Sequence, residues 1–128
     1  MYPEHEAEIQ KHIDNGITDY AIRPYLRKAI TTKHETNAKN AIRKAMKLTM
    51  KKISVYQSAR EKVEKLTHPR EDFKTSREQR IPGFKDSLRI SLNHLGVLID
   101  HHKAIFKILK RANATLPRNV PTGRHFTG

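Results

Sequence analysis

Apolar side chains recur along most of this chain every three or four residues, which is the spacing of one face of an α-helix. One such series lies within residues 42–63, and a second, more strongly apolar series lies within 84–109. Ile9 and Ile13 give the N-terminal region a thin apolar edge. Gly96, in the middle of the second series, would permit a close helix crossing. With no segment typical of a strand, the sequence predicts an all-α protein.

Proline, glycine and capping residues predict where these helices begin and end. Pro3 is followed by three acidic residues that suit a helix N-terminus, and Asn15-Gly16 follows as a stop signal. Pro24 either begins a helix at its first turn or kinks one. Thr32 with Glu35 fits a capping box, so a fresh helix is expected to start at Thr32.

These signals predict a single helical domain over residues 1–112 and a flexible tail over 113–128. Within the domain, 1–19 is an acidic N-terminal helix, 20–66 a basic helical arm and 84–112 the core helix. A continuous helix through the end of the arm would be about 50 Å long. A compact domain of this size is only about 35 Å across. We therefore expect that helix either to be broken or to project.

Charge is distributed very unevenly along the chain. Residues 20–60 hold eleven Lys or Arg and one acid, a local charge of +10 out of a total of +13. Residues 1–19 carry −4, and residues 61–128 carry +7. Like charge at this density is destabilising unless an anion lies opposite it. The distribution favours a polyanionic partner, nucleic acid first.

Within the arm, Lys39, Arg43, Lys47 and Lys51 follow one another at intervals of four, which places them in one row along a helix. The chain has no zinc-finger spacing, no basic region leading into a leucine zipper and no ribonucleoprotein aromatic motif, so we expect non-specific binding to phosphates. Two other interpretations are an acidic membrane or protein surface as partner, and a plain solvated face. The expected phosphate contacts are Lys39, Arg43, Lys44, Lys47, Lys51 and Lys52, extended by Arg23, Arg27, Lys28 and Lys33.

Composition excludes several classes of site. The chain has no Cys, which rules out disulfides, thiolate zinc sites and a Cys nucleophile. No apolar run approaches the 18 residues that a membrane span needs. The acidic, polar N-terminal residues do not resemble a signal peptide. We expect a virion, cytoplasmic or nucleoid-associated location rather than secretion through a signal peptide.

Histidines give incomplete metal sites. His94 and His101 share a helix face without a carboxylate at ligand spacing, and Glu8 with His12 is an equally incomplete pair. His102 lies on the apolar seam and is interpreted as a packed core residue. We expect no metal and no cofactor.

The segment from Arg89 to His94 resembles the Arg-x4-His pattern of the HEPN ribonucleases, which are helical bundles that cleave RNA with this Arg and His paired across a dimer. The resemblance covers six residues of one helix. The polar residue that usually follows the Arg is replaced here by Ile90. An RNase of this type is therefore an alternative, and the favoured interpretation has no enzyme activity.

The layout of residues 20–112, with the tail, resembles the coat proteins of filamentous archaeal DNA viruses. In that family, small basic helical proteins wrap the duplex while a helical bundle faces outward. The resemblance implies a related subunit, a helical virion and no catalysis. The acidic segment could meet the basic arm of a neighbouring copy head to tail, a contact that generates filaments when it does not close. We expect the protein to coat or package nucleic acid non-specifically, and we expect that nucleic acid to be double-stranded DNA. A helical adaptor for an acidic protein or membrane is the other alternative.

Overall fold

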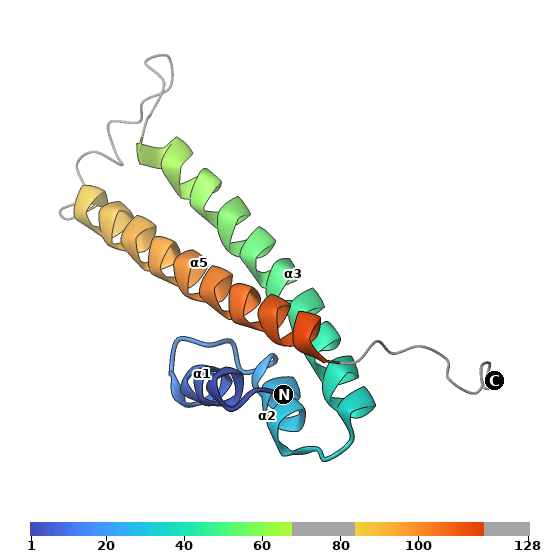
Figure 1. Cartoon of the computed structure of the whole chain (residues 1–128). Helices are drawn as coiled ribbons and strands as arrows, with labels where there is room; N and C mark the ends of the chain where they lie inside the picture. The colour runs from blue at the N-terminus through green and yellow to red at the C-terminus, as the bar shows by residue number, and fades with distance from the viewer. Residues whose placement is uncertain (68–83, 117–128) are drawn as a thin grey trace.

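The computed structural model describes residues 1–67 and 84–116, and over these ranges the chain is all-α (Figure 1). The helices are α1 (Pro3–Asp14), α2 (Arg23–Thr31), α3 (Glu35–Thr67) and α5 (Phe84–Thr115). The predicted fold class is thereby confirmed. The predicted turn-rich connection between the two long helices lies at 68–83, outside the described residues.

The two long helices α3 and α5 lie side by side and antiparallel, and they form a hairpin (Figure 1). The short helices α1 and α2 lie against one end of this hairpin, where α3 begins and α5 ends. Helix α1 contacts α2 and α5, and α2 contacts α3. The fold is therefore a small bundle at one end and a two-helix hairpin at the other.

Local sequence explains the helix starts, with one exception. Pro3 begins α1, with Glu4 and Glu6 in the first turn, and Pro24 lies in the first turn of α2 rather than at a kink. The predicted capping box is wrong, because Thr32 ends α2 with its backbone N–H bonded to Lys28. Helix α3 consequently begins at Glu35, three residues later than expected.

The core forms where all four helices meet. Ile9 and Ile13 of α1 are buried as expected, and His102 of α5 is a fully buried core histidine, also as expected. Leu116 is only 4% exposed and belongs to the core. The predicted tail boundary at residue 113 is therefore wrong: α5 continues to Thr115, and the rest of the tail, 117–128, lies outside the described residues. The other core side chains include Ile22, Leu26, Ala38, Ala41, Ile42, Ala45, Ile105, Ile108, Leu109 and Ala112.

Helix α3 is continuous over 33 residues, or about 50 Å. Because α1 and α2 cover only one end of the hairpin, the second expectation is the correct one: the helix projects beyond the core. Gly96 does not mark a close helix crossing, since a Cβ atom at this position would meet nothing within 4 Å.

Candidate nucleic-acid interface

The exposed face of α3 carries Arg43, Lys44, Lys47 and Lys51. Arg43, Lys47 and Lys51 each follow a buried residue by two positions, which is about 200° round the helix axis. They therefore point away from the core. No acidic residue occurs on α3 between Glu35 and Glu61, and none of the four forms an ion pair within the described part of the chain.

Lys39 begins the predicted row but does not belong to this face. Its side chain is buried, and Nζ donates hydrogen bonds to the main-chain oxygens of Asn113 (3.0 Å) and Leu116 (3.1 Å). These carbonyls lie at the C-terminal end of α5, where the helix dipole favours a cation. The prediction that Lys39 binds phosphate is therefore wrong. The row changes side because residues four apart are offset by about 40° on a helix.

Arg23 holds the connection between α1 and α2. Its Nε donates to the Thr18 carbonyl at 3.1 Å, and its Nη2 donates to the carbonyls of Asn15 (2.8 Å) and Thr18 (2.9 Å). All these bonds satisfy main-chain acceptors of a loop. Arg23 is thus a structural residue, which corrects the expectation that it contacts phosphate.

Lys52 is bound to an acid of the chain itself. Its Nζ lies 3.2 Å from Oδ2 of Asp19. Partial burial disfavours the charged carboxylate, but the Ala21 N–H and Lys52 outweigh this effect and lower the pKa of Asp19. The bond to Asp19 raises the pKa of Lys52. Lys52 therefore links the α1–α2 loop to α3, and its ammonium has a partner within the chain that the sequence did not indicate.

Arg27, Lys28 and Lys33 are exposed, but they do not join the α3 face. Arg27 and Lys28 are on α2, and Lys33 lies in the connection to α3. Lys28 is two positions from the buried Leu26, and so points away from the hairpin. The structure thus separates these three predicted contacts from the four exposed residues of α3.

A second basic stripe lies on α5, and the sequence reasoning missed it. Lys103, Lys107, Lys110 and Arg111 are all exposed. No acid occurs from 101 to 116, and none of the four forms an ion pair among the described residues. The spacing of Lys103, Lys107 and Lys110 is visible in the sequence, but no local pattern shows that this part of α5 lies beside the basic part of α3.

The two stripes lie at the same height of the hairpin. The bonds from Lys39 to Asn113 and the ring contact between Tyr56 and His102, with centroids 5.2 Å apart, fix the antiparallel register. Because the helices are antiparallel, residues that follow Lys39 in α3 lie beside residues that precede Asn113 in α5. Arg43 therefore lies level with the last turns of α5, close to Lys110.

One residue of each stripe, Arg43 and Lys110, faces the uncovered side of the hairpin. Lys52 of α3 and His101 of α5 contact the loop that joins α1 to α2. Arg43 lies nine residues before Lys52, and Lys110 lies nine residues after His101. Nine residues are two and a half helical turns, so Arg43 and Lys110 point to the side opposite α1 and α2. We call the eight residues together the basic surface: Arg43, Lys44, Lys47, Lys51, Lys103, Lys107, Lys110 and Arg111.

The histidines of α5 belong to a polar cluster inside the fold. Nδ1 of His102 lies 2.8 Å from the Leu98 carbonyl, and its Nε2 accepts a hydrogen bond from the Asp19 N–H at 3.1 Å. Nε2 of His101 lies 2.8 Å from the Thr18 hydroxyl. Burial, then the rings of His12 and His102, lowers the pKa of His101 to about 4. These contacts attach the α1–α2 loop to α5.

This cluster does not have the form of a reactive or metal-binding site. Thr18 and His101 have the spacing of a nucleophile and its base, but Thr18 is only 3% exposed, so a substrate has no access to its hydroxyl. Within the described ranges, no group of three or more His, Asp or Glu side chains is arranged to hold a metal ion. His12 lies against His101, with ring centroids 5.1 Å apart.

Arg89 and His94, the residues of the RNase alternative, lie on the N-terminal half of α5, away from the basic surface. Both are exposed, and Arg89 forms an ion pair with Asp86 at 3.5 Å. Both positions therefore lie outside the basic surface.

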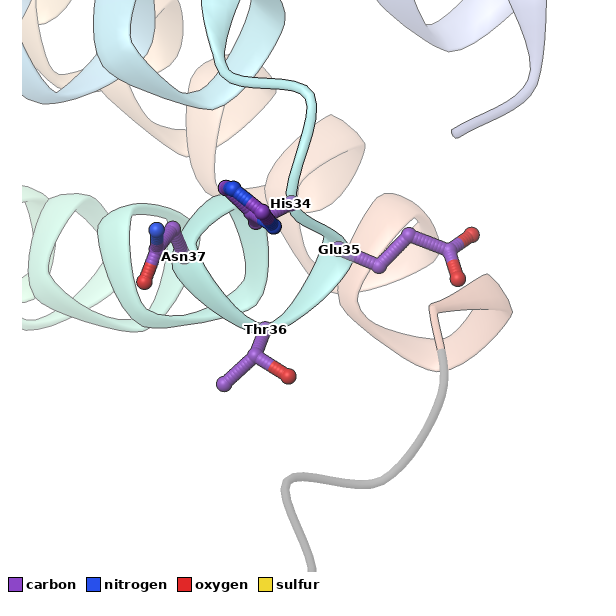
Figure 2. Close-up of a pocket in the computed structure, with 4 residues that line it drawn as sticks. All are labelled: His34, Glu35, Thr36 and Asn37. Atoms are coloured by element: carbon purple, nitrogen blue, oxygen red, sulfur yellow. The ribbon is translucent and has the colours of Figure 1, made fainter.

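An open depression of about 460 Å³ lies at the start of α3, lined by His34, Glu35, Thr36 and Asn37. Figure 2 shows that these side chains point in different directions around one helical turn. Groups that diverge cannot converge on a reacting atom, so the depression does not have the arrangement of an active site.

Comparison of the chain with protein-family models, with curated proteins and with solved structures gave no match. Among the helices described, none contains a stretch long and apolar enough to cross a lipid bilayer. The functional argument therefore depends on the basic surface itself.

Proposed function

We propose that the chain binds nucleic acid non-specifically through the basic surface, with double-stranded DNA as the expected partner, and that it coats or packages it. The observation that carries the proposal is that exposed cationic side chains on α3 and on α5 lie on overlapping lengths of the hairpin, with no acid within either stripe. Solvated protein faces usually mix charges of both signs. A face that carries only positive charge binds an extended polyanion favourably, because each phosphate contact releases condensed counterions from the nucleic acid.

The dimensions of the basic surface suit a duplex. Arg43 to Lys51 covers about 12 Å of helix, a length over which duplex DNA carries about seven charges. The neighbouring helix α5 presents its own stripe at an interaxial distance of about 8–10 Å. A duplex lying across the hairpin would therefore contact residues of both helices.

Side-chain chemistry favours binding without base selection. Six of the eight residues are Lys and two are Arg. The Lys ammonium is a point charge on a flexible stem, which attracts a phosphate without fixing a bidentate geometry on a base edge. The proposal therefore involves attraction to the backbone, and no reaction.

Coating requires many copies of the protein along one duplex. A virion or a nucleoid is a setting in which DNA is coated in this way. Asp19, one acid of the N-terminal segment, is bound by Lys52 within the chain. The exposed acids Glu4, Glu6, Glu8 and Asp14 remain for the proposed head-to-tail contact with a neighbour. This contact, like the virion setting, stays a prediction.

A salt titration of binding to a random-sequence DNA duplex, with an RNA duplex as competitor, tests the proposal. We expect a fall in affinity of about a thousandfold or more between about 50 and 200 mM salt, as for six or more phosphate contacts. We also expect no preference for the RNA competitor. Weak binding that salt does not change would overturn the proposal and favour the adaptor alternative. Tight binding to anionic vesicles in place of DNA would have the same meaning.

A further inference from the structure

The projecting half of the hairpin carries an apolar strip that no described residue covers. Four large side chains are half or more exposed: Val55 (52%) and Leu66 (50%) of α3, with Ile90 (67%) and Val97 (50%) of α5. Single exposed apolar residues are ordinary, but a group of them on one side of a protein marks an interaction site.

The four residues share the side of the hairpin on which α1 and α2 pack. Val55 and Leu66 lie three and fourteen residues after Lys52, which contacts the α1–α2 loop. Val97 and Ile90 lie four and eleven residues before His101, which contacts the same loop. These intervals return to the same helix face. The strip is therefore the continuation of a face that the chain's own short helices cover at the other end.

Charge argues for a second copy of the chain as the occupant of this strip. Residues 20–52 carry ten basic side chains and one acid, so two copies would repel each other strongly there. Residues 53–67 and 84–97 together carry five basic and three acidic side chains, a net charge of +2. The projecting half is thus a part of the hairpin where two chains of +13 can approach.

The mixed charges of this half also suit pairing with itself. Arg60 lies 3.9 Å from Glu64, and Arg89 lies 3.5 Å from Asp86. A two-fold contact brings the same patch of each copy together, so the three acids of one copy can lie opposite cations of the other. The chain's own segment 68–83 is a poor alternative cover, because its only large apolar side chains are Phe73 and Ile81.

We propose that two copies associate through Val55, Leu66, Ile90 and Val97, and that their projecting hairpins form a four-helix arrangement about a two-fold axis. Arg43 and Lys110 point to the opposite side of the hairpin. These two residues of the basic surface therefore stay free in the dimer. This inference stands independently of nucleic-acid binding, since it rests on different residues in a different half of the molecule.

Sedimentation of the full-length chain, freed of nucleic acid, tests the proposal at high salt, where exposed charges are screened. We expect a concentration-dependent dimer for the unmodified chain and a monomer for the double variant Ile90→Glu with Val97→Glu. Met50→Glu is the matched control, because Met50 is 57% exposed but lies outside the strip. It should remain dimeric. Circular dichroism should show equal helix content in all three proteins.

A second measurement uses the absence of cysteine. The variants Val97→Cys and Met50→Cys each carry a single thiol, and a short thiol-specific cross-linker should join two chains efficiently only through residue 97. A wild-type chain that stays monomeric at all concentrations would overturn the proposal. Dimers that persist in the double Glu variant, or equal cross-linking at both positions, would also overturn it. Duplex binding by the monomeric double Glu variant should also be measured. If that variant still binds DNA, dimer formation and the proposed function are separate properties.

Discussion

The side-chain ammonium of Lys39 donates a hydrogen bond to the main-chain carbonyl of Asn113 across the hairpin, with 3.0 Å between Nζ and O. This contact joins the second turn of α3 to the last turn of α5, and the two residues are 74 apart in the sequence. It also divides the basic residues of α3 by role. Lys39 holds the two long helices in register, whereas Arg43, Lys47 and Lys51 remain exposed.

Replacing Lys39 by Met should destabilise the fold. The aliphatic stem keeps its packing, but the carbonyls of Asn113 and Leu116 lose a charged donor. Bonds to charged groups contribute about 1.5–3 kcal/mol each, and we expect a loss of about 2 kcal/mol in the free energy of unfolding. Urea denaturation followed by circular dichroism measures it. The salt slope of DNA binding should not change, and a flatter slope would return Lys39 to the interface.

Stability should fall as the pH drops from about 6.5 towards about 4. His101 has a pKa lowered to about 4 from 6.5, mainly by burial, and burial also lowers the pKa of His12. Over this range the unfolded chain binds protons that the folded chain does not, so acid favours unfolding. Asp19, whose pKa is lowered, contributes stability that is lost only at lower pH. Thermal unfolding at a series of pH values measures the decline.

The variant His101→Gln isolates the histidine contribution. Its amide can still bond to the Thr18 hydroxyl but does not titrate, so the decline between pH 6.5 and 4 should become shallower than in the unmodified chain. His94→Gln, on the exposed face of the same helix, is the matched control. An identical pH profile for His101→Gln and the unmodified chain would contradict the assignment.

Gly96→Ala should stabilise the chain. The position lies inside α5, and an added Cβ would meet nothing within 4 Å. Alanine is favoured over glycine within a helix by about 1 kcal/mol, and we expect a gain of about that size in urea denaturation. A loss of stability would show that the space beside Gly96 is filled by something outside the described residues, such as a partner.

The sequence was sufficient for the fold class because apolar spacing alone distinguishes buried helices from strands. The sequence was insufficient for the site because the charge of a residue does not show whether its side chain points to solvent or to the core. Lys39 and Arg43 are four residues apart and look equivalent in the sequence. Only the position of α5 shows that the first is buried and the second exposed. Lys52 likewise pairs with Asp19, a contact between segments that no local pattern relates.

The stripe on α5 gives a prediction that the sequence reasoning did not contain. Replacing Lys103, Lys107 and Lys110 by Gln should weaken duplex binding and flatten its salt dependence, because these side chains and the α3 residues lie on overlapping lengths of the hairpin. Fluorescence anisotropy with a labelled duplex measures both quantities. If binding remains unchanged, the interface is confined to α3.

The most direct test compares two triple variants that remove the same charge from different faces. One carries Arg43→Gln, Lys47→Gln and Lys51→Gln on α3, and the other carries Arg27→Gln, Lys28→Gln and Lys33→Gln. All six residues are exposed, so neither variant should unfold. Each lost phosphate contact lowers the slope of log affinity against log salt by about 0.9. We predict that the α3 variant loses up to about three such contacts and that the other triple variant keeps nearly the full slope. Equal slopes in the two variants would contradict the account, because they would show that net charge alone, and not the basic surface, determines binding.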